Sequence, residues 1–376
     1  MFNSKVLSLD IGSKNTKIVL GSQSKKNVII EKAITIPTPV GCYNDGNILD
    51  ITKFKSEILD VLQEENIKCK NIIITSKSTL IITRDIDIPV AKKEDMDSII
   101  KFQMEKYLPI RFDDYIMQYK VLEEFEEVGV KKAKVTVVVY PKTMADGYYN
   151  LIKELKGNAV ALDISSNSIN KLFTYDIKIN DENYSLEDTV SVIDLGYDFI
   201  NVNIITGGNV QFTRIITYGG AYIDIDIAKQ LSISEQEAEK QKIECCNLEA
   251  DSLSNIQSST VNDITKAQVK NWIREIERLL NYYKNKEQGN KVDKIYIYGG
   301  SSNLKGIETF LKDGLNLPVI KIQRLSNVNC SKINESKVDP SKKDIFKVES
   351  SKVDPARIDE ELSKYLNAIG AIIRLR

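Results

Sequence analysis

The sequence predicts an α/β protein made of two similar halves, and three observations lead to this prediction. Each half contains a short apolar strand that ends in Asp-x-Gly, at Asp10-Ile11-Gly12 and at Asp194-Leu195-Gly196. In each half, two further strands follow with hairpin spacing, and helical patterns come after them. The length of 376 residues suits two to three domains at about 150 residues each.

The first half is predicted to begin with three antiparallel strands, with a turn at 21–27 between the second and third. A helix follows, capped by Asp50 or Thr52. Two more strands come next, and Pro89 ends the second of them. The predicted elements are strands 6–11, 16–20 and 28–36, a helix at 53–65, and strands 71–75 and 79–88.

The composition changes after Pro89, which predicts a small α+β subdomain inserted at residues 90–160. Residues 176–188 are polar and are predicted to be a connection. The predicted elements of this region are a helix at 92–107, strands 115–125 and 133–140, a helix at 142–156 and a strand at 159–164.

The second half is predicted to repeat the three-strand arrangement and to continue with helices. The polar stretch 326–355 contains Ser-Lys-Val-Asp-Pro twice and is predicted to be a flexible loop. The predicted elements are strands 189–195, 200–206 and 210–217, helices 221–231, 234–243 and 263–285, a strand at 292–298, a helix from 304, a strand at 318–322 and a last helix at 356–374.

These elements suggest a first lobe at 1–89 that is completed by 160–188 and 356–376. The inserted subdomain covers 90–160, and a second lobe covers 189–325.

Composition excludes several classes of function. The chain has no His, which removes His-based general bases, nucleophile dyads and His-ligated zinc. The net charge is -1, which argues against a nucleic-acid-coating protein. The five Cys form no Cys-x-x-Cys and are expected to be reduced thiols. The start lacks signal-peptide order, and no apolar run approaches the ~18 residues of a membrane span, so a cytoplasmic protein is expected.

The two Asp-x-Gly turns predict a phosphate site. A turn directly after a strand exposes backbone N–H groups, and glycine lets the main chain approach a ligand closely. The aspartates place two carboxylates beside these turns, and Mg²⁺ takes one or two carboxylates and keeps several waters. One Asp-x-Gly alone is weak, but two in matching halves favour a clamp on a triphosphate. The alternative is a pair of ordinary acidic hairpins.

Two further patterns suit a nucleotide. Tyr298-Gly299-Gly300-Ser301-Ser302-Asn303-Leu304 is a strand–Gly–Gly–helix junction, where small residues let a base or sugar lie against the backbone. Glu239 and Lys242 are three apart on one helix and suit ribose hydroxyls, although such a pair is ordinarily a solvated ion pair.

These motifs resemble those of the superfamily of actin, sugar kinases and 70-kDa heat-shock ATPases, with phosphate motifs at 10–17 and 194–200 and an adenosine motif at 298–304. Gly219-Gly220-Ala221 and Ala238-Glu239-Lys240-Gln241-Lys242 resemble FtsA and PilM. Leu108-Pro109 and Asn367-Ala368-Ile369-Gly370-Ala371 are more similar to PilM, the actin-like, FtsA-related family of type IV pilus assembly. The resemblance implies an actin-like ATPase fold with ribonuclease H-like duplicated lobes and an inserted small subdomain.

The resemblance also implies the roles of individual residues. Asp10 and Asp194 hold Mg²⁺ through water. The residues implied in ATP binding are Gly12, Ser13, Lys14, Asn15, Lys17, Gly196, Tyr197, Gly219, Glu239, Lys242, Gly299, Gly300, Ser301 and Asn303.

One departure from the family pattern concerns hydrolysis. The second phosphate turn usually carries Thr where this chain has Ile200, and an apolar side chain cannot donate to a phosphate oxygen. Asn201 points to the other face of the strand. Asp163 is the one candidate for orienting a water, with capping of the next helix as the alternative. Weak or absent ATPase activity is therefore expected.

The resemblance implies a cytoplasmic adaptor that contacts the membrane through its partner. The partner is the cytoplasmic N-terminal segment of a PilN-like bitopic membrane protein, held between the first subdomain and the inserted one. The helix face at 99–107 and the strand at 133–140 are candidate walls, with subdomain core as the alternative. The pilus assembly ATPase and self-association are further expected contacts.

Two other functions remain open at this point. An FtsA-like cell-division filament protein would use the last helix as a membrane anchor, but Asp359, Glu360 and Glu361 oppose an anionic surface and the chain ends at Arg376, so packing onto the first lobe is favoured. A small-molecule kinase of the superfamily would need a catalytic carboxylate and a polar sugar site, which the sequence does not show.

Overall fold

The computed structural model describes residues 4–108, 110–250, 256–286, 288–330, 351–352 and 361–374. The chain forms two compact units. Unit 1 consists of Met1–Thr38, Cys69–Thr75 and Asp163–Arg376, and unit 2 consists of Pro39–Lys68 and Ser76–Leu162. Residues 39–68 and 76–89 therefore fall in the same unit as the inserted subdomain, whereas both predicted phosphate turns fall in unit 1.

The first sheet of unit 1 contains the run β6–β1–β2–β3–β18. β1 pairs antiparallel with β2 and parallel with β6, so its last residues lie in the middle of the sheet. All six residues of β1 are buried. The strands are β1 (Val6–Ile11), β2 (Asn15–Ser24), β3 (Asn27–Pro37), β6 (Asn71–Ser76) and β18 (Val328–Cys330).

The predicted turn at 21–27 is too long, because β2 continues to Ser24. Gly21 lies at a register shift between β2 and β3. A Cβ on Gly21 would lie 2.6 Å from the carbonyl oxygen of Ile29. The glycine therefore allows a close approach of β3 and does not end the strand. The turn itself falls at Lys25, which has φ 56.

Part of the predicted loop at 326–355 forms strands. β18 pairs parallel with Val28–Ile30 of β3, and β19 (Ser351–Lys352) pairs antiparallel with Thr35 and Ile34 of the same strand. Residues 331–350 and 353–355 of that loop lie outside the described residues.

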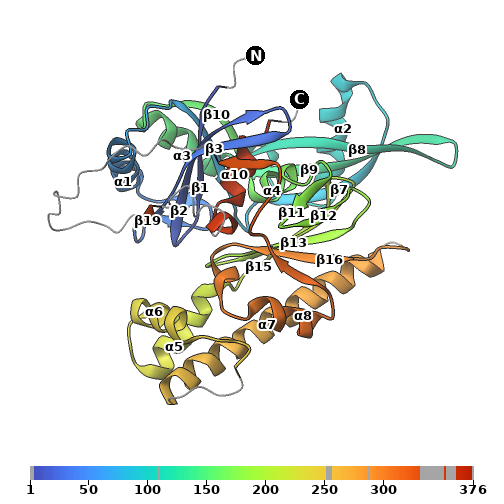
Figure 1. The fold of residues 1–376 in the computed structure, drawn as a ribbon. Helices are drawn as coiled ribbons and strands as arrows, with labels where there is room; N and C mark the ends of the chain where they lie inside the picture. The colour runs from blue at the N-terminus through green and yellow to red at the C-terminus, as the bar shows by residue number, and fades with distance from the viewer. Residues whose placement is uncertain are drawn as a thin grey trace. The chain divides into compact units, whose positions relative to one another are not determined.

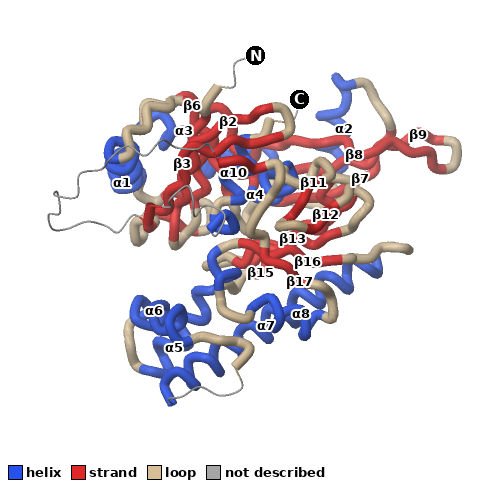
Figure 2. Tube along the Cα trace, in the orientation of Figure 1, coloured by secondary structure: helices blue, strands red, loops and turns tan. Residues whose placement is uncertain are grey.

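The second sheet repeats the strand order of the first. Its strands β13, β15 and β16 are labelled in Figures 1 and 2. Its order is β15–β14–β13–β16–β17, with β13 antiparallel to β14 and parallel to β16. The run β16–β13–β14–β15 therefore matches β6–β1–β2–β3, which confirms the predicted duplication. The strands are β13 (Val190–Leu195), β14 (Ile200–Thr206), β15 (Asn209–Ile216), β16 (Lys294–Tyr298) and β17 (Val319–Lys321).

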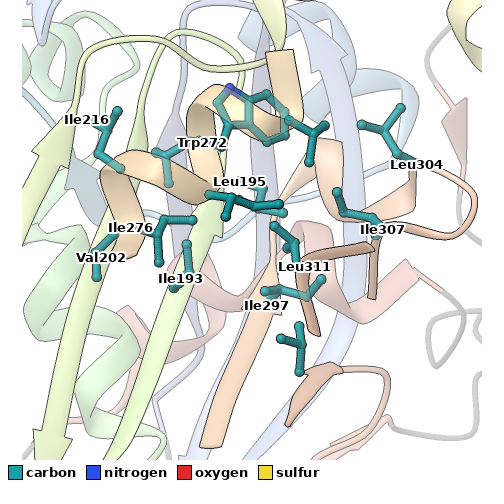
Figure 3. Packing of buried hydrophobic residues seen from close by; sticks show 14 of the residues in the cluster. Ile193, Leu195, Val202, Ile216, Trp272, Ile276, Ile297, Leu304, Ile307 and Leu311 are labelled. Atoms are coloured by element: carbon teal, nitrogen blue, oxygen red, sulfur yellow. The ribbon is translucent and has the colours of Figure 1, made fainter. Parts of the chain in front are cut away.

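One face of the second sheet carries the hydrophobic core (Figure 3). Ile193 and Leu195 of β13 and Ile297 of β16 pack with Trp272 and Ile276 of the long helix α7 (Ile256–Lys286). Because side chains alternate along a strand, the residues between them turn to the opposite face. The side chains of Asp194 and Tyr298 therefore lie on the face of the sheet opposite the hydrophobic core.

Unit 1 differs from the predicted pattern in several places: the helix at 165–171 was not among the predicted elements, and α7 begins at Ile256 and not at 263. A hairpin, β11 (Ile177–Ile179) and β12 (Glu182–Tyr184), occupies the predicted connection 176–188. A 3-10 turn, η2 (Gly300–Asn303), precedes α8 (Ile307–Leu315). The remaining helices are α4 (Ser165–Lys171), α5 (Gly220–Leu231), α6 (Glu235–Cys245), η4 (Leu362–Lys364) and α10 (Leu366–Ile372).

The last helix packs back onto the first sheet, as predicted. All residues of α10 are buried, and it contacts β1, β2 and α4. A Cβ on Gly370 would lie 2.0 Å from the carbonyl oxygen of Ser168, so α10 and α4 cross at backbone contact. The predicted helix at 356–374 is too long, because residues 362–364 form a 3-10 turn and the α-helix covers only Leu366–Ile372. Residues 356–360 lie outside the described residues.

Unit 2 contains a three-stranded sheet of order β7–β9–β8. Asp50 caps α1 by accepting from the amides of Thr52 and Lys53, as predicted. A short hairpin of β4 and β5 was not predicted. The elements are β4 (Tyr43–Asn44), β5 (Asn47–Ile48), α1 (Ile51–Glu64), β7 (Ile82–Pro89), α2 (Lys93–Glu105), η1 (Phe112–Asp114), β8 (Tyr115–Glu127), β9 (Val130–Pro141), α3 (Lys142–Glu154) and β10 (Asn158–Ile164).

Candidate functional site

The two Asp-x-Gly turns have the same geometry. The amide of Gly12 donates to the carbonyl of Asn15 at 3.2 Å, and the amide of Gly196 donates to the carbonyl of Phe199 at 3.2 Å. Asp10 and Asp194 are each the last residue but one of the strand before the turn. The duplication of the sheets therefore extends to the turns and to the carboxylates beside them.

The first turn is stabilised by Thr38, a residue that no sequence motif indicated. Thr38 donates through its hydroxyl to the carbonyl of Gly12 at 2.6 Å and through its amide to the carbonyl of Lys14 at 3.0 Å. The hydroxyl of Thr16 lies 2.9 Å from that of Thr38. The ammonium of Lys17 donates to the carbonyl of Asn15 at 3.4 Å. Ser13, which lies within this turn, is partly exposed.

Both carboxylates act on one buried phenol. Tyr298 has a pKa well above its ordinary value, first because it is buried and then because Asp194 and Asp10 are near it. Asp10 is 8% exposed and Asp194 is 5% exposed. The phenol donates to Oδ1 of Asn367 at 2.9 Å, and Nδ2 of Asn367 donates to Oδ2 of Asp194 at 3.4 Å. The structure therefore brings the ends of β1, β13 and β16 to a common centre.

Glycines shape the second turn. A Cβ on Gly219 would lie 2.4 Å from the carbonyl oxygen of Tyr197, and a Cβ on Gly299, where φ is +92°, would lie 2.3 Å from Oδ1 of Asp194. The amides of Gly220 and Ala221 donate to the carbonyls of Gly196 and Tyr197. Glycine at 219 and 299 is thus required for the close packing of these segments on the turn.

The start of the predicted adenosine motif has open space beside it. A Cβ on Gly300 would meet nothing within 4 Å. Ser301 Oγ donates to the carbonyl of Gly196 at 3.5 Å, which joins this junction to the second turn. Asn303 accepts from Lys321 at 2.6 Å and donates to the carbonyl of Gly300 at 3.1 Å.

A charged cluster joins the first turn to helix α6. Lys14 forms an ion pair with Glu239 at 2.7 Å, and its ammonium lies 5.0 Å from the centre of the Tyr197 ring. Lys242 forms a buried ion pair with Asp224 at 2.5 Å. Three of the residues predicted to bind nucleotide therefore meet, and a fourth lies one helical turn away on α6.

Asp224 is the residue of this cluster that no sequence motif identified. It is 0% exposed, and its Oδ2 has no hydrogen-bond partner among the described residues. Burial raises the pKa of Asp224, while the Lys242 ammonium acts in the opposite direction. Its signal in the sequence is only an acidic residue within a helix that is otherwise apolar on one face.

Asp163 is engaged in a buried ion pair. It accepts from Lys171 at 2.6 Å, from Nδ2 of Asn167 at 2.7 Å and from the amide of Ile164 at 2.9 Å. Lys171 also donates to the carbonyls of Ala371 and Ile373 in the last helix. Burial lowers the pKa of Lys171, and the nearby Asp163 carboxylate opposes that shift.

Ile200 lies in the hydrophobic core and not beside the turn's donors. It is 0% exposed and belongs to the cluster under the second sheet. Asn201 lies on the opposite face, as alternation predicts, where its amide donates to Ser165 Oγ at 3.2 Å and its carbonyl accepts from Thr213. Neither side chain supplies the hydroxyl that a Thr at position 200 would bring.

The donor set at the turns fits Mg²⁺ better than a transition metal. No group of three His, Cys, Asp or Glu side chains suited to a metal occurs among the described residues. Two buried carboxylates, Asp10 and Asp194, suit a small hard cation that keeps most of its waters. A fully protein-ligated site is not what this arrangement offers.

The candidate walls of the partner site are part of the core of unit 2. Alternate residues of β9 pack against the inner face of α2, through Ala133, Val135, Val137, Val139, Met96, Ile100 and Met104. The outer face of α2 is different. Phe102 is 60% exposed and Tyr107, just after the helix, is 53% exposed, with Lys106 and Arg84 over their rings.

Across the part of the chain that the structure describes, no helix combines the length and apolar character needed to cross a membrane. α10, the helix considered as a membrane anchor, has all its residues buried against unit 1.

Solved structures of several proteins have a similar fold. The structure described as the PilM-PilN type IV pilus biogenesis complex matches with TM-score 0.77 and 18% identity over 98% of this chain and 97% of that chain. Ethanolamine utilization protein EutJ from Carboxydothermus hydrogenoformans matches with TM-score 0.51 and 10% identity over 86% of each chain. MreB 5 of Spiroplasma citri bound to AMPPNP matches with TM-score 0.51 and 13% identity over 85% of this chain and 91% of that chain. These similarities establish the actin-like α/β fold.

The comparison with protein families agrees with the fold. The family described as "Type IV pilus assembly protein PilM" matches residues 8–374. That match spans both duplicated sheets, the turns, unit 2 and the last helix. The chain therefore belongs to the PilM family of actin-like type IV pilus assembly proteins.

Proposed function

We propose that this chain is an adaptor of type IV pilus assembly that binds Mg²⁺ and ATP at its paired turns and, so loaded, holds a PilN-like membrane protein. The observation that carries the nucleotide part is the convergence on Tyr298 of two Asp-x-Gly turns that share the same internal hydrogen bond. Two solved relatives add support, since one is a PilM-PilN complex and another is bound to AMPPNP.

The turns would hold the phosphates and the metal. Asp10 and Asp194 would accept from the waters of Mg²⁺, which would neutralise phosphate charge. The backbone amides of Ser13 and Lys14 in the first turn and of Tyr197 in the second would face the phosphate oxygens, together with the side chains of Ser13 and Lys17. Asn15 shapes the first turn through its carbonyl.

The rest of the nucleotide would lie on the glycine-rich segments. Gly299, Gly300 and Ser301 would support the adenosine, because the space beside Gly300 is open. Glu239 and Lys242 would face the ribose hydroxyls. Lys14 now binds Glu239 at 2.7 Å, so a nucleotide would compete with this ion pair for both side chains.

We expect turnover to be slow or absent. General-base catalysis needs a carboxylate that can accept a proton, whereas Asp163 is bound to Lys171 and Asn167. Ile200 supplies no donor to the transferring phosphate. The nucleotide would then act by fixing one conformation of the protein, not by releasing energy.

The partner would be a short segment of a PilN-like single-span protein, which would place the chain at the cytoplasmic side of the membrane. The outer face of α2 offers exposed Phe102 and Tyr107 beside Lys106 and Arg84. Aromatic rings flanked by cations suit a peptide with apolar and acidic side chains. Contacts with a pilus assembly ATPase or a second copy of this chain would use other surfaces.

Calorimetry tests both parts of the proposal. The wild-type chain is titrated with ATP in Mg²⁺ and then with a peptide from the N-terminus of a PilN-like protein. Asp10→Ala is expected to weaken Mg²⁺·ATP binding at least about tenfold, or about 1.4 kcal/mol. Asp313→Ala, an exposed aspartate on α8, is the matched control and is expected to change nothing.

The outcomes separate the two parts. Absence of ATP binding, or an Asp10→Ala variant that binds as tightly as the control, contradicts the nucleotide site. ATP binding without peptide binding contradicts the adaptor role alone.

A further inference from the structure

Asn367 uses both ends of its side-chain amide at the centre of the site. Its Oδ1 accepts from the phenol of Tyr298 at 2.9 Å, and its Nδ2 donates to Oδ2 of Asp194 at 3.4 Å. Asn367 is 6% exposed, and Tyr298 is 1% exposed. A phenol that donates can only face the carbonyl end of the amide, which leaves the NH₂ end for the carboxylate. Asp194, whose carboxylate only accepts, and Tyr298, whose phenol donates, together determine which way the amide points.

The other oxygen of Asp194 lies close to the backbone of Gly299, because a Cβ on Gly299 would lie 2.3 Å from Oδ1. The carboxylate therefore lies near Gly299 through one oxygen and accepts from the amide of Asn367 through the other. Its orientation depends on a residue from the last helix as well as on its own strand.

The last helix is itself firmly placed. Lys171 donates to the carbonyl of Ile373 at 2.8 Å while it binds Asp163 at 2.6 Å. Gly370 lies at backbone contact with Ser168 of α4. Both contacts follow Asn367 within two helical turns and fix the helix that carries it, so its amide has little freedom to follow a carboxylate that moves.

We propose that Asn367 is a positioning residue, which with Tyr298 orients the Asp194 carboxylate toward the water shell of a bound Mg²⁺ and so makes Mg²⁺-dependent ATP binding depend on the last helix. This inference rests on the nucleotide site proposed above. Asn367 acts through Asp194, since its amide is already committed to Asp194 and Tyr298. An amide suits this role because it can donate to a carboxylate without adding charge near the metal.

The test separates metal-dependent from metal-independent binding. ATP affinity is measured by calorimetry in Mg²⁺ and in EDTA, and the ratio of the two is compared among variants. Asn367→Leu is expected to reduce that ratio about tenfold, the size expected for loss of a hydrogen bond to a charged group, with the affinity in EDTA unchanged. Tyr298→Phe removes one oxygen and is expected to reduce the ratio by a smaller factor in the same direction.

Asn170→Leu is the matched control, because Asn170 is a buried asparagine of α4 whose amide donates to the carbonyl of Gly208 at 3.1 Å. It is expected to leave the ratio unchanged. In the nucleotide-free protein, the side-chain amide protons of Asn367, followed by nuclear magnetic resonance, are expected to shift in Tyr298→Phe and not in the control.

Equal losses in Mg²⁺ and in EDTA would indicate a merely structural role and overturn the inference, as would an unchanged ratio in both site variants. If Asn367→Leu does not fold, Tyr298→Phe decides alone. A wild-type chain whose ATP binding does not respond to Mg²⁺ contradicts the proposed site and the inference together. A wild-type response that survives in the variants contradicts the inference only.

Discussion

Substitution of Gly370 by alanine tests the crossing of α10 and α4 directly. The added Cβ would lie 2.0 Å from the carbonyl oxygen of Ser168 and 2.6 Å from its carbonyl carbon. Both obstacles are backbone atoms, so no side chain can rotate away. The clash is relieved only if the two helices separate by about 1 Å. We expect this separation to cost a free energy at the upper end of the ~1–3 kcal/mol usual for overpacking.

The net effect includes an opposing gain. Alanine is favoured over glycine within a helix by about 1 kcal/mol. Gly370→Ala is therefore expected to destabilise unit 1 by about 2 kcal/mol, which lowers the unfolding midpoint by about 4–8 °C for a domain of this size. The same separation would displace Asn367, so Mg²⁺·ATP binding is expected to weaken as well.

Gly147→Ala is the matched control for this change. Gly147 also lies within a helix, α3, but its Cβ would meet nothing within 4 Å. The substitution there is expected to be neutral or to stabilise by up to about 1 kcal/mol. Differential scanning fluorimetry and urea unfolding measure both variants. If Gly370→Ala melts within 1 °C (about 0.5 kcal/mol) of wild type, the close crossing is wrong.

Three further predictions follow from the charged and aromatic residues. Lys171→Met leaves Asp163, which is 6% exposed, without its cation. The free energy of unfolding measured in urea is therefore expected to fall by about 3–5 kcal/mol, and a fall below ~1 kcal/mol contradicts the buried ion pair. Burial raises the pKa of Asp224 above its ordinary value of 3.8, so the folded chain binds the carboxyl proton of Asp224 more tightly than the unfolded chain does. The contribution of Asp224 to the free energy of unfolding therefore falls as pH rises through the window just above 3.8. Asp224→Asn is expected to flatten that part of the stability curve, and equal slopes in the two proteins count against the assignment. Phe102→Ala and Tyr107→Ala are each expected to weaken binding of a PilN-like peptide about five- to thirtyfold. Tyr282 is a similarly exposed ring on α7, and Tyr282→Ala is expected to leave binding unchanged. Equal effects at all three positions argue against α2 as the contact surface.

The fold could be predicted where local pattern and global topology agree. The strands around Asp10 and Asp194 are apolar runs that end in turn residues, and both occupy the centre of their sheets. The turn after β2 was misplaced because Gly21 has the residue type of a turn, while its actual cause is a close approach by Ile29. That approach depends on a neighbouring strand and has no local signal.

The missed strands share a different cause. The missed strands β4, β5, β11, β12, β18 and β19 are each only two or three residues long, too short for a strand pattern to stand out in the sequence. β18 and β19 form because β3 supplies their backbone partners, whereas β4 pairs with β5 and β11 pairs with β12. A pairing of this kind is decided by tertiary position and not by the propensity of the residues themselves.

The sequence motifs of the candidate site could be predicted, whereas the residues that hydrogen-bond to those motifs could not. Asp-x-Gly identifies Asp10 and Asp194 because the backbone chemistry is local. Thr38 and Asn367 contact the turns from 26 and 173 residues away. No spacing rule connects residues so far apart, so such supports become visible only when the strands are placed.

The pairing of β3 has a consequence for assembly. An open strand edge is a template on which a second chain can add its own strand. Here β18 takes the edge at Val28–Ile30 and β19 takes it at Ile34 and Thr35. The chain thus covers this edge of β3 with its own segments. Polymerisation by strand addition at β3 would first require β18 and β19 to unpair from it.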